Sequence, residues 1–125
     1  PKNAPTVLLV DDEEMIRTTL SLLLKSEGYN VCAAEDGNAA LAVFQQRRQE
    51  IKLVITDLKM SGMNGYELIT ALRAQDANLP IIALTGMADA KHAAAVNAIG
   101  ARMLAKPMTL AILTKAVEQA LSGSG

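Results

Sequence analysis

Short apolar runs alternate along the whole chain with longer segments in which apolar side chains recur at helical spacing. The apolar runs predict strands at Thr6–Val10, Asn30–Ala34, Leu53–Asp57, Ile81–Leu84 and Arg102–Ala105. The third run is bulky and rich in β-branched residues, which is typical of a strand buried on both faces of a parallel sheet. Strict alternation of strands and helices predicts one α/β domain, with helices on both faces of that sheet.

A helical segment follows each predicted strand. The first opens at Asp11-Asp12 and runs through about Ser26, with Ile16, Leu20, Leu23 and Leu24 on one face. The second carries Leu41 and Phe44, the third begins at Tyr66 and buries Leu68, Ile69 and Leu72, the fourth covers about Ala88 to Ile99, and the last ends at Leu121. We expect a domain over residues 6–121, preceded by a tail at 1–5 and followed by a Ser-Gly tail or linker at 122–125.

Composition argues against several classes of partner. The chain has 125 residues, half of them apolar, and a net charge of −1, which gives no electrostatic case for binding nucleic acid or an anionic membrane. No apolar run approaches the roughly 20 residues that span a bilayer, and no signal peptide is visible. The single cysteine, Cys32, excludes an internal disulfide and suits the cytoplasm. Because Cys32 falls in a predicted strand, we expect a buried small hydrophobe.

Polar residues follow four of the five predicted strands directly. Asp11 and Asp12 follow the first strand, Asp57 ends the third, and Thr85 and Lys106 follow the fourth and fifth. The carboxyl ends of parallel strands share one edge, so these side chains are predicted to converge there. Three carboxylates at about 4 Å repel by about 4 kcal/mol per pair at an effective dielectric near 20. Lys106 supplies one positive charge to offset this repulsion, and a divalent cation is expected in addition.

Mg²⁺ suits this set of residues because it takes carboxylate oxygens, keeps waters and completes its shell with phosphate oxygens. A carboxylate beside Mg²⁺, a lysine and a hydroxyl can accept a phosphoryl group as an acyl phosphate. Taken singly, each residue has an ordinary structural explanation as a helix cap, a turn residue or a helix start. Their joint occurrence, each after the appropriate strand, favours the functional interpretation.

The motifs VLLVDDEE (7–14), VITDLKMSGMNGYE (54–67), LPIIALTG (79–86) and LAKPM (104–108) closely resemble the receiver domain of bacterial two-component response regulators. The resemblance covers about Thr6 to Leu121. It implies a flavodoxin-like (βα)5 fold, a doubly wound parallel sheet with strand order 2-1-3-4-5.

The same resemblance assigns roles to individual residues. It implies that Asp57 is the phosphoacceptor, and that Asp12, Asp57 and the backbone carbonyl of Lys59 bind Mg²⁺, with Asp11 acting through water. It also implies that Thr85 hydrogen-bonds the phosphoryl group and that Lys106 pairs with it. The implied donor is a phosphohistidine on a histidine kinase or a histidine phosphotransfer domain.

Three further expectations concern switching and partners. Met103 stands where relatives usually carry the aromatic ring that moves with the threonine, so we expect a shallower switch at Thr85 and Met103. Met15 and Leu22 lie close together on the first helix and are predicted to dock the partner. The segment from Ala88 to Ile99 carries few charges, which predicts a monomer.

Three alternatives remain open. The chain could be a receiver segment of a hybrid histidine kinase rather than of a separate regulator. It could be a degenerate receiver that only binds a partner, although the intact polar set argues against this. A phosphohydrolase with an aspartyl-phosphate intermediate would need a second acid two residues after Asp57, where Lys59 stands.

Overall fold

The protein is built on a five-stranded parallel sheet with the strand order β2-β1-β3-β4-β5. The computed structural model describes residues 4–58, 65–85, 98, 100–105 and 109–122. Its strands are β1 (Thr6–Val10), β2 (Asn30–Ala34), β3 (Ile51–Asp57), β4 (Ile81–Thr85) and β5 (Arg102–Ala105). The strand order confirms the predicted flavodoxin-like fold.

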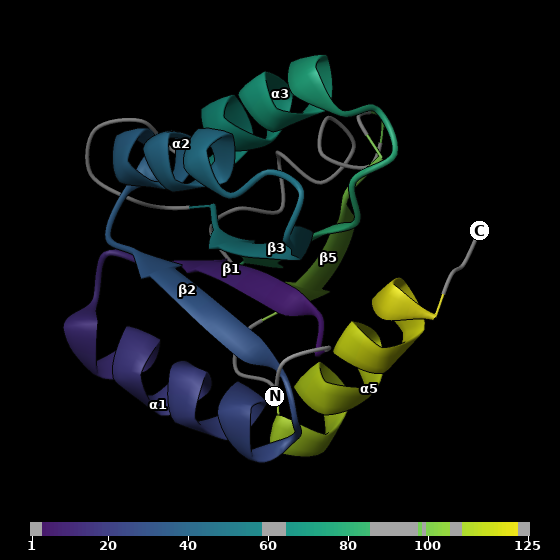
Figure 1. The fold of residues 1–125 in the computed structure, drawn as a ribbon. Coiled ribbons are helices and arrows are strands. Elements are labelled where there is room, and N and C mark those ends of the chain that lie inside the picture. The colour runs from purple at the N-terminus through teal and green to yellow at the C-terminus, as the bar shows by residue number, and fades with distance from the viewer. Residues whose placement is uncertain (1–3, 59–64, 86–97, 99, 106–108, 123–125) are drawn as a thin grey trace.

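Within the described part of the chain, four helices cover the two faces of this sheet. They are α1 (Glu14–Ser26), α2 (Gly37–Gln46), α3 (Gly65–Gln75) and α5 (Leu110–Leu121). Helices α2 and α3 lie on one face, and α1 and α5 lie on the other (Figure 1). The helix predicted over Ala88 to Ile99 lies outside the described residues, except for Ala98.

Each face of the sheet has its own hydrophobic core because successive strand residues point to opposite sides. In β1, Leu8 and Val10 pack toward α2 and α3, while Val7 and Leu9 pack toward α1 and α5. The first core includes the predicted Phe44, Leu68, Ile69 and Leu72, and also Cys32, which is buried as expected. The second core includes Leu24 of α1 and three residues of α5: Leu113, Ala116 and Val117. Both faces of the central strands are therefore dry, as the continuous apolar runs predicted.

Several predicted boundaries were wrong by one to three residues. Helix α1 begins at Glu14 and not at Asp11-Asp12, because the Asp11 N–H still donates to the Ala34 carbonyl of β2. Strand β3 begins at Ile51, two residues early, because Ile51 pairs with Thr6 before the β1–β3 register shifts. Helix α3 begins at Gly65, and β4 extends to Thr85.

Local capping explains where two of the helices begin. The Asp36 carboxylate accepts a hydrogen bond from the Ala39 N–H at 2.8 Å at the start of α2. At the start of α5, the Thr109 hydroxyl accepts one from the Ile112 N–H at 3.1 Å. These caps satisfy amide groups that the first helical turn leaves without partners. Of the helices described, none is long and apolar enough to cross a membrane.

Candidate functional site

The candidate site lies where β1 and β3 end side by side at the carboxyl edge of the sheet. Val10 of β1 pairs with Thr56 of β3, so the next residues, Asp11 and Asp57, lie at neighbouring positions on this edge. On the other side of β3, Asp57 pairs with Leu84 of β4. The parallel register thus brings two aspartates that are far apart in the sequence to the same place.

Asp11, Asp12 and Asp57 form one acidic cluster in the structure. Each contributes a carboxylate oxygen, and these oxygens all lie within 4.8 Å of one another. Asp11 has no exposed surface and Asp57 is only 4% exposed, whereas Asp12 faces solvent. The predicted convergence of these three side chains is confirmed.

The backbone after Asp57 is held in place by its neighbours. The Leu58 N–H donates to the Leu84 carbonyl at 3.1 Å, and the Gly65 N–H donates to the Leu58 carbonyl at 3.0 Å. The Thr56 hydroxyl donates to the Asp57 carbonyl at 3.0 Å. These bonds connect the end of β3 both to β4 and to the first turn of α3.

Gly65 is required by a close approach of two backbones. A Cβ atom at this position would lie 2.2 Å from the Asp57 carbonyl oxygen and 2.6 Å from the Leu58 Cα. Both distances are shorter than nonbonded atoms tolerate, so a side chain would displace either α3 or the end of β3. Gly65 therefore sets how closely α3 packs behind the candidate site.

The turn between β1 and α1 is also held by specific bonds. One Asp11 carboxylate oxygen accepts from the Glu13 N–H at 2.9 Å, and the Asp11 carbonyl accepts from Arg17 Nη1 at 2.7 Å. A short Asp side chain commonly bonds the backbone two residues onward in this way. The bonds orient Asp11 inward and leave the first helical turn to begin after Glu13.

Sequence reasoning missed the roles of Gly65 and Arg17. A glycine directly before a helix is also typical of an ordinary turn, so the sequence around Gly65 did not mark a close packing contact. Arg17 lies six positions after Asp11, a spacing that marks no known local motif. The available signal was a single basic residue at the end of the first turn of a helix that follows an acidic pair.

Several predicted site residues are placed only in part. Lys59 and Lys106 lie outside the described residues. The backbone of Thr85 belongs to β4 and pairs with Ala105 of β5, which puts it on the same edge as Asp57. The side chain of Thr85 is not among those that the structure describes. Met103 is half-buried and packs against the core under α2 and α3.

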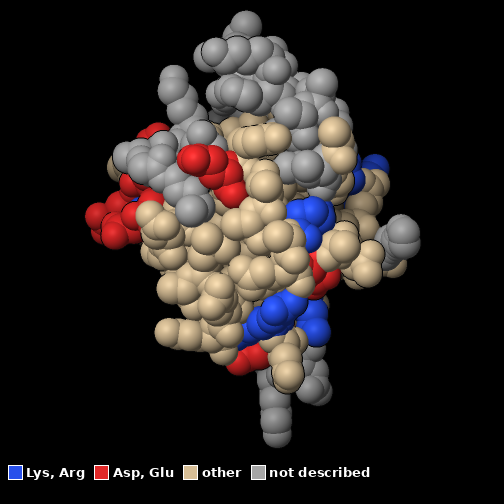
Figure 2. Space-filling model, turned by 90° about the horizontal axis from the view of Figure 1, so that it is seen from above, with Lys and Arg blue, Asp and Glu red and all other residues tan. Residues whose placement is uncertain are grey.

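The acidic cluster belongs to a wider region of negative charge. Glu13 and Glu14 are exposed at the start of α1, and Glu67 is exposed in the first turn of α3. Figure 2 views the face covered by α2 and α3, and its acidic side chains gather mainly at the left, with most basic ones farther right. Acidic residues near helix N-termini are favoured by the helix dipole, which contributes to this separation.

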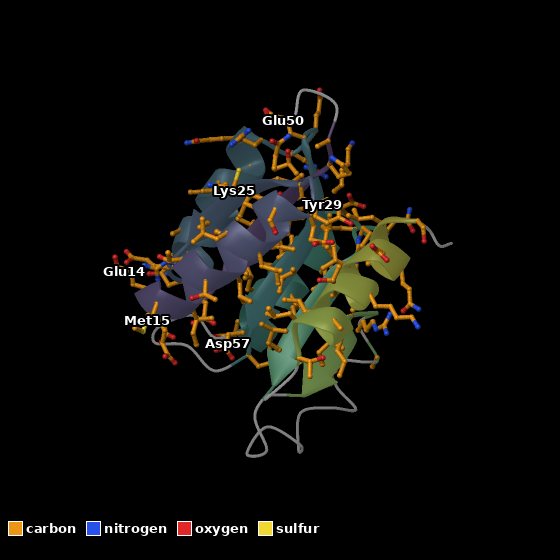
Figure 3. All side chains as sticks on the ribbon, turned by 90° about the horizontal axis from the view of Figure 1, so that it is seen from below. Glu14, Met15, Lys25, Tyr29, Glu50 and Asp57 are labelled. Carbon is orange, nitrogen blue, oxygen red and sulfur yellow. The ribbon has the colours of Figure 1, made fainter. Side chains whose placement is uncertain are left out.

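The predicted docking residues are both exposed. Met15 is 80% exposed and Leu22 is 63% exposed, on the outer side of α1. Figure 3 shows Met15 at the same end of the molecule as Asp57, with Glu50 at the opposite end. Leu110 and Ile112 at the start of α5 are also exposed large hydrophobic residues. Both predicted docking residues are therefore accessible on the surface of α1, and their role in docking stays a prediction.

The chemistry of the cluster suits a hard divalent cation. Two ionised carboxylates within 4.8 Å repel by roughly 3.5 kcal/mol or more at an effective dielectric of about 20. A cation that bridges their oxygens would offset this repulsion, and Mg²⁺ accepts such a set together with water and phosphate oxygens. Asp11, Asp12 and Asp57 are the residues that could hold it.

Comparison with known proteins identifies a family. The family model described as the response regulator receiver domain matches residues 7–118. The regulatory protein VanRB of Enterococcus faecalis is 37% identical over 120 residues, which cover 95% of this chain and 53% of that protein. The chain thus spans about half the length of this relative. The transcriptional regulatory protein GlrR of Escherichia coli is 36% identical over 119 residues, which cover 94% of this chain and 26% of that protein.

Solved structures agree with this match. A response regulator receiver domain protein from Clostridium thermocellum superposes with a TM-score of 0.91 at 29% identity, covering 94% of both chains. The chemotaxis protein CheY4 of Vibrio cholerae superposes with a TM-score of 0.86 at 35% identity, covering 94% of this chain and 99% of that one. The likeness extends over nearly the whole chain in each case.

Proposed function

This chain belongs to the response regulator receiver domain family, and from that premise we propose that it takes a phosphoryl group onto Asp57 and thereby changes its affinity for a partner. The observation that carries the proposal is the acidic cluster. Asp57 is nearly buried at the end of a central strand, with the Asp11 and Asp12 oxygens within 4.8 Å. A carboxylate that served only to solubilise the surface would not be placed there.

The proposed reaction moves a phosphoryl group from a phosphohistidine to Asp57. A carboxylate oxygen of Asp57 attacks phosphorus, an O–P bond forms, and the N–P bond to the donor imidazole breaks. Mg²⁺, when bound, would neutralise charge on the transferring phosphoryl oxygens. Asp12, Asp57 and the Lys59 carbonyl would hold the ion, with Asp11 acting through water, and Thr85 and Lys106 would contact the phosphoryl oxygens in the product.

The proposed donor is a histidine kinase or a histidine phosphotransfer domain that docks on α1. Met15 is exposed at the end of the molecule where Asp57 lies, which suits a contact beside the reacting groups, and Leu22 is exposed about two turns farther along α1. Burying two such side chains would contribute about 3 kcal/mol to binding at about 1.5 kcal/mol each. Both a stand-alone regulator and a hybrid histidine kinase contain a receiver of this kind, and the proposal covers the receiver alone.

The proposed output is a shift between two conformations of the region after β4. Thr85 is the last residue of β4, and Met103 of the neighbouring strand β5 pairs with Ala83 of β4. An unbranched methionine can fill a space in several rotamers, so the inactive and active arrangements differ little in free energy. Phosphorylation would then shift populations less than in relatives that carry an aromatic ring at this position, and we propose that the domain does so as a monomer.

Labelling with a small phosphodonor tests the chemistry. With Mg²⁺ and acetyl phosphate, the intact mass of the protein should rise by one phosphoryl group, and Asp57→Asn should abolish the rise. Asp76→Asn is the matched control, because Asp76 lies beyond the C-terminal end of α3, at the opposite edge of the sheet. A phosphorylated Asp57→Asn protein, or a wild-type protein that gains no phosphoryl group, would refute the proposal.

A further inference from the structure

Arg17 connects the end of β1 to the start of α1. Its Nη1 donates to the Asp11 carbonyl at 2.7 Å, and its backbone N–H donates to the Glu13 carbonyl at 3.0 Å. Arg17 is half-buried and is the fourth residue of α1, so its side chain reaches back along the helix to the strand end. One residue thus contacts both sides of the turn that carries the acidic pair.

The bond to Arg17 adds to two others that hold Asp11. The Asp11 N–H donates to the Ala34 carbonyl at 3.2 Å, and its carboxylate accepts from the Glu13 N–H at 2.9 Å. The carbonyl that Arg17 binds belongs to the peptide plane between Asp11 and Asp12. Rotation of this plane would change the orientation of the Asp12 backbone relative to Asp57. A hydrogen bond from a charged, planar guanidinium resists that rotation better than a neutral donor does.

We propose that Arg17 is a positioning residue for the metal site formed by Asp11, Asp12 and Asp57. The inference rests on the proposed function, because it concerns the Mg²⁺ that this function requires. Groups that orient the ligands of a metal, without touching it, typically change its affinity by about 10-fold to 100-fold. Arg17 acts in this way on the backbone of two ligands at once.

Electrostatics alone predicts the opposite change in Mg²⁺ affinity when Arg17 is replaced by a neutral residue. A cation near a cluster of carboxylates competes with a bound metal ion, so removing its charge should strengthen Mg²⁺ binding. Loss of the hydrogen bond to Asp11 should weaken binding, because Asp12 then loses its orientation toward Asp57. The direction of the change therefore separates positioning from simple charge.

The experiment compares Mg²⁺ dissociation constants of the folded protein and its variants by NMR titration of backbone amides. Arg17→Met keeps the length of the side chain and a good helix former, and it should bind Mg²⁺ about 10-fold more weakly than wild type. Arg17→Lys keeps the charge and a donor and should recover part of this loss. Lys25→Met removes the same charge from the exposed last turn of α1 and should bind like wild type.

A second measurement needs no metal. The Glu13 amide is bonded to the Asp11 carboxylate, so its hydrogen exchange should be faster in Arg17→Met than in wild type or Lys25→Met. Wild-type or tighter Mg²⁺ binding in both Arg17 variants would overturn the inference while leaving the proposed function intact. A wild-type protein that binds no Mg²⁺ would overturn the proposed function and this inference with it. If Arg17→Met does not fold, Arg17→Lys carries the comparison.

Discussion

Replacing Gly65 with alanine should destabilise the protein and impair the acidic site together. The added Cβ would lie 2.2 Å from the Asp57 carbonyl oxygen and 2.6 Å from the Leu58 Cα. Both are backbone atoms, which cannot rotate away as the end of a side chain could. Overpacking of this kind costs about 1–3 kcal/mol, and rigid neighbours favour the upper end of that range. Alanine also has a greater helix propensity and makes the unfolded chain less flexible, which together stabilise the protein by about 1 kcal/mol. We therefore expect the free energy of unfolding to fall by about 2 kcal/mol net.

Urea unfolding followed by far-ultraviolet circular dichroism measures this loss as a lower midpoint with an unchanged slope. Labelling with acetyl phosphate should also be slower in Gly65→Ala, because either α3 or the end of β3 must move. Gly28→Ala is the matched control. Gly28 has a φ of +97° with open space around it, so alanine there costs about 1–2 kcal/mol in backbone strain and leaves the site untouched.

The two glycine variants should therefore both lose stability, while only Gly65→Ala loses labelling rate. A Gly65→Ala protein as stable as wild type would show that the start of α3 and the end of β3 can separate without a loss of folding free energy. A destabilised Gly65→Ala protein that is labelled at the wild-type rate would show that the packing of α3 does not set the geometry of Asp57.

Two more predictions concern Tyr29 and the surface of α1. Burial, followed by the charges of Glu118 and then Glu27, raises the pKa of Tyr29, so the folded state favours the neutral phenol. This contribution to stability is complete below the ordinary tyrosine pKa of about 10 and is lost as the pH rises through the higher folded value. Glu118→Gln should lower the pKa of Tyr29 toward its ordinary value in an absorbance titration at 295 nm; an unchanged titration would contradict the assigned cause. Changing Met15 and Leu22 to serine should remove most of the roughly 3 kcal/mol that their burial contributes and slow transfer from a subsaturating phosphohistidine partner about 100-fold. Acetyl phosphate labelling should be unchanged, whereas equal loss with both donors would indicate damage to α1.

Much of the fold could be predicted because its signals are local. A strand buried on both faces must be apolar throughout, and a helix on a sheet must repeat its apolar residues every three or four positions. The residues of β1, β2 and β5 were predicted with the observed bounds for this reason. The bounds of α1 and β3 were wrong because a bond between β1 and β2 and a register shift between β1 and β3 decided them. Neither interaction leaves a local pattern.

The sequence by itself determined which side chains meet at the acidic site. Parallel strands share a carboxyl edge, so residues that directly follow them in the chain must gather there, and Asp11, Asp12 and Asp57 do. Only the tertiary structure decided how that cluster is supported. The contact of Gly65 with the end of β3 and the bond from Arg17 to Asp11 depend on distances between elements that no periodicity encodes. Periodicity fixes the direction in which a side chain points, whereas packing fixes how near two backbones approach.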